Sequence, residues 1–298
     1  MSGPVAKPVS SSVVPRLDPA LRVRDVDWVA LDIEATGVAW GHDRIVELGA
    51  ARFRVSKDGT VVPGPRFSAL VNPGLPIPAV VARITGLDDA AVASAPALEA
   101  VWGEFDAFMG DAFVLAHGAR ADLAWLGSEA LRMRTLPLRA HFFCTLELAR
   151  KAIIKAPRYT LEALTQHLGI APEEAPFHRA LADALHTRNL FARCAAALEA
   201  DLVSELGFDR ALPWPGPEVY AVRVPERLRV LEGLIVAQAR CRISYRGGSA
   251  GREPRPITPL GFFAHEGVPY LRAWCHLDDS GKSFRCDRVA AVLDPEAG

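Results

Sequence analysis

An acidic pair near the start of the chain is the first group that could do chemistry. In Asp32-Ile-Glu-Ala-Thr-Gly37 the two carboxylates stand two residues apart at the end of an apolar run. On a strand, side chains with this spacing share one face. Two carboxylates held so close repel each other unless a cation lies between them, so a metal site explains the pair. For an isolated pair, a polar strand end that faces water is the more common explanation.

A second acidic segment, His117-Gly-Ala-Arg-Ala-Asp122, directly follows the apolar run 113–116. This pattern predicts that Asp122 lies where a helix begins after a strand. A carboxylate at that position could simply cap the helix or favour its positive end. Taken alone, the segment therefore does not indicate a function.

A third segment, His178-Arg-Ala-Leu-Ala-Asp183, stands at the start of an alanine-rich stretch with helical pattern. Five helical residues separate two side chains by ~140°, so His178 can approach Asp183 only from a loop that precedes the helix. The alternative is an exposed histidine beside an aspartate that pairs with Arg179 or His186.

Together, in this order, the three segments resemble the DEDDh 3′–5′ exonucleases, a group that includes the proofreading epsilon subunit of bacterial DNA polymerase III, ribonuclease T and oligoribonuclease. The resemblance runs from about Val26 to Cys194 and implies an α/β fold of the RNase H-like type, with a mixed sheet flanked by helices. Four further stretches are similar to the family: Arg44–Gly49, Val71–Gly74, Ile84–Gly86 and Tyr159–Leu164.

The resemblance also assigns roles to residues. It implies four metal-binding carboxylates and a general base, namely Asp32, Glu34, Asp122, Asp183 and His178. It places Thr36, Gly37 and His117 at the substrate. The chain departs from the family in its second motif, where Gly118 and Ala121 stand in place of the usual Asn and Phe. Loss of that aromatic ring affects substrate preference more than hydrolysis.

The chemistry of phosphodiester hydrolysis explains this set. It needs an activated water and a stabilised leaving oxygen, and two cations ~3.5–4 Å apart can serve both. Mg²⁺ or Mn²⁺ suits an all-oxygen cage, and two divalent cations balance four carboxylates. A neutral imidazole, with an ordinary pKa of ~6.5, can accept the proton of the water, so activity should rise with pH. The 3′ to 5′ direction is what the resemblance implies.

Charge is distributed unevenly along the chain. The whole sequence has 34 basic and 35 acidic residues, a net charge of −1. Residues 21–212 carry 20 basic and 24 acidic side chains, and residues 226–298 carry 11 and 9. Because bulk attraction to phosphate is weak at this balance, nucleic acid must be bound locally or through metal ions in the larger part.

Composition predicts a two-domain organisation. A flexible tail over residues 1–20, an exonuclease domain over 21–206, a proline-rich linker over 207–226 and a small domain over 227–298 account for the 298 residues. No apolar run reaches the ~18 residues of a membrane span, and the first residues lack the apolar core of a signal peptide. The expectation is a cytoplasmic protein with no membrane partner, whose five cysteines are reduced thiols.

The C-terminal part contains strand-like runs with aromatic and basic residues on one face, above all Val268–Leu277. Such a face can stack bases and contact phosphates, although a strand buried on both sides is the alternative. Residues from about Arg227 to Leu293 resemble the WYL domain, an SH3-like β-barrel linked with nucleic-acid ligands, with Pro269 in place of the usual Trp. By that resemblance, five residues line or support its ligand pocket: Tyr245, Tyr270, Arg272, Arg285 and Arg288.

The sequence therefore predicts a metal-dependent 3′–5′ exonuclease, active on single-stranded DNA, whose WYL domain binds nucleic acid or a regulatory ligand. Two alternatives stay open: an exoribonuclease acting on short RNA, and a catalytically silent nucleic-acid-binding regulator. The family suggests a part in DNA repair, and the sequence leaves open whether the protein forms a homodimer.

Overall fold

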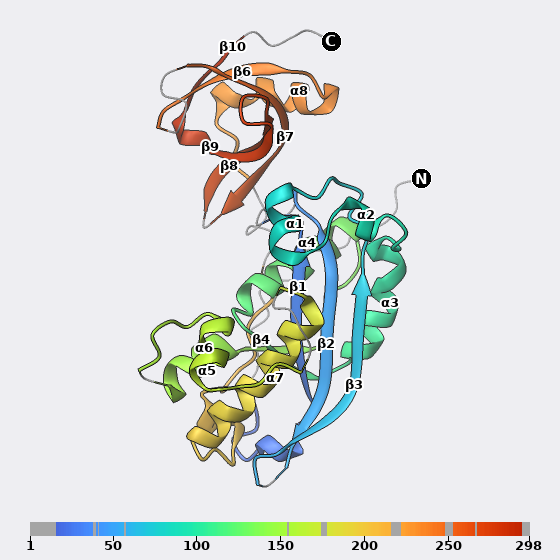
Figure 1. Cartoon of the computed structure of the whole chain (residues 1–298), viewed down its shortest axis with the longest axis vertical. Coiled ribbons are helices and arrows are strands. Elements are labelled where there is room, and N and C mark those ends of the chain that lie inside the picture. Colours follow the sequence, from blue (N-terminus) through green and yellow to red (C-terminus); the bar gives the residue numbers. More distant parts are fainter. Residues whose placement is uncertain are drawn as a thin grey trace. The chain divides into compact units, whose positions relative to one another are not determined.

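The computed structural model consists of two units (Figure 1). The first comprises Met1–Thr36 and Ile45–Pro215, and the second Gly37–Arg44 and Gly216–Gly298. The structure describes residues 16–37, 40, 42–56, 58–153, 155–173, 178–215, 222–247, 253–265 and 267–293.

The first unit is built on a five-stranded mixed sheet with the strand order β3-β2-β1-β4-β5. Its strands are β1 (Trp28–Ala35), β2 (Ile45–Val55), β3 (Val61–Leu70), β4 (Phe113–Ala116) and β5 (His141–Cys144). The first three form an antiparallel meander, while β1 with β4, and β4 with β5, pair in parallel. The predicted mixed sheet is thus confirmed.

Seven α-helices belong to the described part of this unit. They are α1 (Ala79–Thr85), α2 (Asp89–Val92), α3 (Leu98–Met109), α4 (Arg120–Met133), α5 (Thr145–Ala152), α6 (Leu161–His167) and α7 (Ala180–Ala197). Helix α7 packs against β1 and β2 (Figure 1). Helix α5 stops at Ala152 because Ile153 turns out of the helical region, and α7 stops at Ala197, just before Glu199 takes a left-handed φ of 51°.

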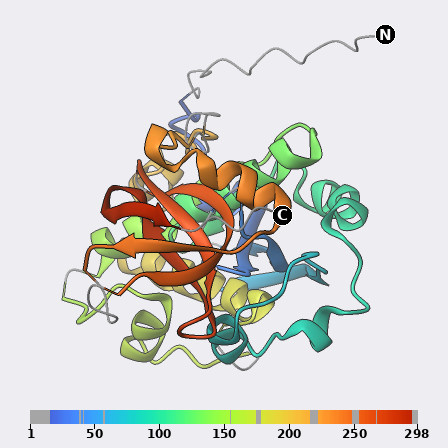
Figure 2. The same cartoon turned by 90° about the horizontal axis from the view of Figure 1, so that it is seen from above.

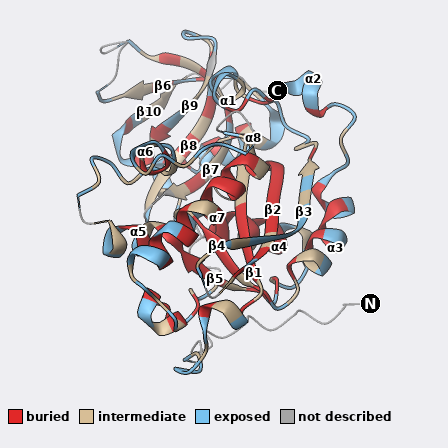
Figure 3. Ribbon diagram, turned by 60° about the horizontal axis from the view of Figure 1, so that its bottom comes forward, coloured by how far each residue is buried: buried red, intermediate tan, exposed pale blue. Residues whose placement is uncertain are grey.

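The core between the sheet and α7 is aromatic. Trp28 is fully buried at the start of β1, its indole N–H donates to the Val23 carbonyl at 2.9 Å, and its ring lies 4.7 Å from that of Phe191 on α7. The first half of β1 and most of β2 are buried, whereas the edge strand β3 is largely exposed (Figure 3). Since burial of each large apolar side chain contributes ~1.5–3 kcal/mol, this core fixes the strand that carries the acidic pair.

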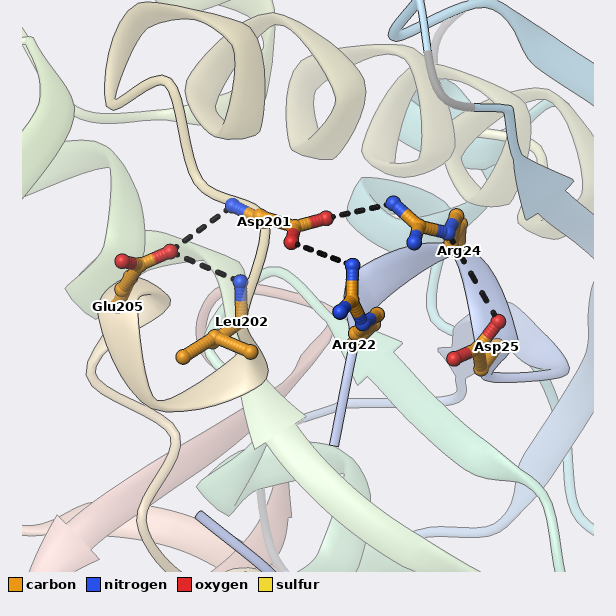
Figure 4. Close-up of polar contacts among 6 residues, drawn as sticks. All are labelled: Arg22, Arg24, Asp25, Asp201, Leu202 and Glu205. Carbon is orange, nitrogen blue, oxygen red and sulfur yellow. Dashed lines mark hydrogen bonds and ion pairs between the residues drawn. The ribbon is translucent and has the colours of Figure 1, made fainter. Parts of the chain in front are cut away.

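Polar contacts link the segment before β1 to the segment after α7 in the same unit (Figure 4). Asp201 accepts hydrogen bonds from Arg22 at 3.0 Å and from Arg24 at 2.8 Å. Glu205 accepts from the backbone N–H groups of Asp201 and Leu202, both at 2.8 Å. The segment after α7 is thereby tied to the segment before β1, near the short 3₁₀ helices Val23–Asp25 and Val203–Leu206.

The second unit contains a five-stranded antiparallel sheet with the order β10-β6-β7-β8-β9 (Figure 2). Its elements are α8 (Val230–Ala237), β6 (Cys241–Tyr245), β7 (Arg255–His265), β8 (Val268–Cys275), β9 (Ser280–Arg285), β10 (Val289–Leu293) and 3₁₀ turns at Glu226–Leu228 and Cys286–Arg288. On β8, Leu271 and Cys275 are buried while Trp274 is 36% exposed, so the alternative of a strand buried on both sides is wrong. Within the described residues, no helix combines the length and apolar character needed to cross a bilayer.

Candidate active site

Strand pairing brings the first acidic pair onto the face of the sheet that α7 covers. In the β1–β2 register, Asp32 lies opposite Gly49 and Glu34 lies opposite Glu47. Cross-strand partners point to the same face, so all four positions lie together. The pattern-based expectation that Asp32 and Glu34 share a face is met by this geometry.

Gly49 allows the start of α7 to rest directly on β2. A Cβ atom at this position would overlap with backbone atoms of Ala180 and Leu181. Asp183 stands in the first turn of that helix, 8% exposed. Close approach of the helix therefore places Asp183 over the acidic pair of β1.

Glu47 fixes the same helix start by charge. It is only 2% exposed, and its carboxylate accepts hydrogen bonds from Arg179 Nε at 3.1 and 3.2 Å and from Arg179 Nη2 at 2.8 Å. The Ala180 backbone N–H donates to it at 3.0 Å. Sequence reasoning gave Glu47 no role, although an acidic residue inside a buried apolar strand is a signal that such a partner exists.

His178 approaches the carboxylates from the loop before α7, as the helical spacing requires. Its φ of 65° is left-handed, and its backbone N–H donates to Asp183 Oδ2 at 3.1 Å. Glu34, His178 and Asp183 each offer one ligand atom, and these atoms all lie within 4.8 Å of one another. The exposed imidazole thus stands beside two of the four carboxylates.

Asp122 lies in the first turn of α4, 8% exposed, just beyond the turn at Gly118, whose φ of 96° suits glycine. Asp32 and Asp122 are not part of the 4.8 Å group, but their charges reach it. Burial, followed by repulsion from Asp122, Asp183 and Glu34, raises the pKa of Asp32 well above its usual value. The structure therefore places all four predicted carboxylates in one electrostatic cluster.

The other three carboxylates also hold their protons more tightly than usual. Burial, followed by repulsion from Asp183 and Glu47, raises the pKa of Glu34 to about 7. Burial raises the pKa of Asp122 to about 7 and that of Asp183 to about 6. Burial of four ionised carboxylates, with repulsion at Asp32 and Glu34, is costly at neutral pH and is relieved by a cation.

The donor set fits a divalent cation. Asp183 Oδ1 is buried and has no hydrogen-bond partner among the described residues, which leaves it available as a ligand. The remaining ligand atoms are carboxylate oxygens with one imidazole beside them, a set that suits Mg²⁺ or Mn²⁺. Asp32, Glu34, Asp122 and Asp183 are thus the residues that would hold the metal.

The three residues expected at the substrate are engaged inside the protein. The ring nitrogens of His117 are both used: Nε2–H donates to the Tyr159 carbonyl at 2.8 Å, and Nδ1 lies 3.1 Å from Thr145 Oγ1. These hydrogen bonds hold the turn before α4 against the segments that begin α5 and α6, and a contact of His117 with substrate stays a prediction. Thr36 is 2% exposed, and a Cβ at Gly37 would overlap with the Asp43 carboxylate.

Of the five residues expected at a WYL ligand, four contact other residues of the domain, and the fifth, Arg288, is exposed. Tyr245 and Arg285 have internal partners, because the Tyr245 hydroxyl accepts from the Arg285 N–H at 3.4 Å and the Arg285 guanidinium pairs with Asp287 at 2.9 and 3.0 Å. Tyr270 stacks on Phe263 at 5.2 Å. Arg272 bonds Ser283 Oγ at 3.3 Å, and the exposed Arg288 follows in the 3₁₀ turn.

Replacement of Gly49 tests how closely α7 must sit. We expect Gly49→Ala to lower the free energy of unfolding by about 1–3 kcal/mol or more, because the added methyl group would overlap with backbone atoms at the start of α7. Gly103→Ala on α3 is the control, because a Cβ there meets no atom within 4 Å. Equal melting temperatures for both variants would contradict the expectation.

Comparisons with known proteins agree with this geometry. The profile of the family described as "Exonuclease" matches residues 29–191, and that of the "WYL domain" matches residues 226–293. DNA polymerase III subunit epsilon of Aquifex aeolicus is 32% identical over 167 residues, which are 56% of this chain and 79% of that protein. A DNA polymerase III subunit epsilon-like protein of Rhodobacter capsulatus is 36% identical over 185 residues, 60% of this chain but 25% of that protein.

Among solved structures, the "crystal structure of full-length 3'-exonuclease" superposes with a TM-score of 0.51 and 15% sequence identity. The match covers 63% of this chain and 65% of that one. At this level of identity the likeness concerns the fold alone. It agrees with the mixed sheet flanked by helices described above.

Proposed function

Because the chain belongs to the exonuclease family, whose profile spans residues 29–191, we propose that it is a two-metal 3′–5′ exonuclease that removes nucleotides from single-stranded DNA. The observation that carries the proposal is the cluster of Asp32, Glu34, Asp122 and Asp183, in which burial raises the pKa of all four carboxyls and repulsion within the cluster raises those of Asp32 and Glu34 further. Such a cluster is unfavourable unless cations and phosphate are part of the working state.

The residues of this chain would then act as follows. The four carboxylates hold the divalent cations, which supply Lewis-acid stabilisation of the oxygens at the phosphorus. His178, exposed and left-handed in φ, accepts the proton of the attacking water at its imidazole. The ion pair between Glu47 and Arg179 fixes the start of α7 on the sheet, and with it the positions of His178 and Asp183.

Support for DNA comes from the relatives, two of which are named for DNA polymerase III epsilon. The test is incubation of 5′-end-labelled DNA and RNA oligonucleotides of one sequence with the full chain and Mg²⁺ or Mn²⁺. We expect stepwise shortening of the DNA from its 3′ end. Faster shortening of short RNA would assign an exoribonuclease instead, and strand binding without turnover would assign a silent regulator.

Residues 226–293 form a WYL domain, and we propose that its exposed face binds nucleic acid. Tyr270, Arg272 and Trp274 alternate with the buried residues of β8 and offer rings and a cation on one side. Base stacking on an aromatic ring is worth ~1–3 kcal/mol. We also propose that residues 207–226 act as the linker between the two domains.

Substitution of Trp274 tests the proposed face. We expect Trp274→Ala to weaken binding of a single-stranded oligonucleotide roughly fivefold or more, as measured by fluorescence anisotropy, with little change in turnover at saturating substrate. Leu277→Ala removes another exposed apolar side chain, 57% exposed in the turn after β8, and is the control. Unchanged affinity in the Trp274 variant would refute a gripping role for this face.

A further inference from the structure

A basic segment lies beside the turn that carries Asp122. Residues 145–160 contain four basic side chains and one acidic one, in a unit whose overall balance is acidic. Lys151 is used internally, because its Nζ donates to the Glu205 carbonyl at 2.7 Å. The other three cations are exposed and are called the basic strip: Arg150, Lys155 and Arg158.

Hydrogen bonds fix the strip to the active-site turn. His117, the first residue of the turn that leads to Asp122, donates to the Tyr159 carbonyl at 2.8 Å. Tyr159 in turn anchors the segment, since its hydroxyl donates to the Ile153 carbonyl at 2.5 Å and its ring lies 6.0 Å from the Arg150 guanidinium carbon. The strip is therefore held at a set position beside the turn that leads to Asp122.

Interactions of His117 show how near the strip lies to the turn. Burial lowers the pKa of His117, and the positive charge of Arg150 lowers it further, so this cation reaches the turn. Thr145, the first residue of α5, has its Oγ1 3.1 Å from His117 Nδ1, so the segment contacts the turn near both of its ends. The segment from α5 to α6, yellow-green in Figure 1, therefore lies beside the turn that leads to Asp122.

The basic strip can offset the repulsion between the carboxylate cluster and a polyanionic strand. A concentration of carboxylates repels a polyanion until cations are bound, and even then the cations neutralise only the immediate site. Lys and Arg side chains that contact successive phosphates supply the missing attraction without reading sequence. Within the described residues no ion pair engages Lys155 or Arg158, and Arg150 lies over the Tyr159 ring.

Resting on the nuclease function proposed above, we propose that Arg150, Lys155 and Arg158 form a second binding site, which holds the backbone phosphates of the strand 5′ to the bond that is cut. The ligand class is a single-stranded polynucleotide of several phosphates. The strip takes no part in the chemical step. It raises the local concentration of the strand and keeps it on the enzyme between cuts.

The test separates strand binding from chemistry by substrate length. We expect the full chain with Arg150→Ala, Lys155→Ala and Arg158→Ala to lose roughly tenfold or more in kcat/KM on a strand of about 20 nucleotides at low salt. The plot of log kcat/KM against log salt should become shallower by about one for each phosphate that the variant no longer binds. Hydrolysis of a dinucleotide, which has a single phosphodiester, should stay within about twofold of wild type.

Arg139→Ala is the matched control. This arginine is 71% exposed and pairs with Asp111 at 3.5 Å, but it precedes β5, at the opposite end of the parallel β4–β5 pair from Asp122. An unchanged salt slope on the long strand would overturn the proposal, as would an equal loss on the dinucleotide. Binding of a labelled strand to Asp32→Asn protein, with the basic strip either intact or replaced by alanines, tests the strip even if no hydrolysis is found. In that case the nuclease function fails separately.

Discussion

Asp32→Asn should lower exonuclease activity by about 10³-fold or more. Asp32 lies at the centre of the cluster, since its carboxyl is affected by Asp122, Asp183 and Glu34 alike. Bound metal ions stabilise the charge of the transition state by several kcal/mol, and each ~1.4 kcal/mol is a factor of ten in rate. The measurement is kcat on a 5′-labelled strand at saturating Mg²⁺ or Mn²⁺. Asp25→Asn, a change of the same kind in the short 3₁₀ helix before β1, is the control.

The same substitution should stabilise the protein when no cation is present. Carboxyls whose pKa is raised by the fold contribute full stability below their ordinary pKa and lose it as pH rises through the raised value. For Asp183 that value is about 6, and for Glu34 and Asp122 it is about 7. The metal-free melting temperature of the wild type should therefore fall between pH 5 and pH 8.

Removal of one repelling charge should reduce that fall. For a unit of this size ~1 kcal/mol corresponds to about 2–4 °C, so a difference of several degrees at pH 8 is expected between Asp32→Asn and wild type. Mn²⁺ should raise the melting temperature of the wild type more than that of the variant. A variant that is both inactive and less stable without metal at pH 8 would contradict a strained carboxylate cluster.

The carboxylate set could be predicted from the sequence because its spacing follows local rules. Asp32 and Glu34 share a face by the period of a strand, and His178 had to precede the helix of Asp183 by the period of a helix. Glu47 escaped prediction, since its partner Arg179 is 132 positions away in the chain and only sheet register brings them together. The internal hydrogen bonds of His117 were missed for the same reason.

His178→Ala should lower kcat by roughly 10²–10⁴-fold, the range for loss of a general base. The imidazole is exposed, so its removal leaves no buried cavity and the melting temperature should change little. The remaining rate should rise on addition of free imidazole, which can reach an exposed position and accept the same proton. His167→Ala removes an exposed imidazole from the last turn of α6 and should behave as wild type.

Titration of metal-free protein with Mn²⁺ decides between two roles for His178, because its ring also lies within 4.8 Å of ligand atoms of Glu34 and Asp183. A general base leaves the affinity for Mn²⁺ nearly unchanged when it is removed, while kcat falls. A metal ligand lowers both together, and free imidazole then restores activity only as far as it restores Mn²⁺ binding. Because Asp183 Oδ1 and the other carboxylates remain in His178→Ala, we expect Mn²⁺ affinity to persist and the base role to hold.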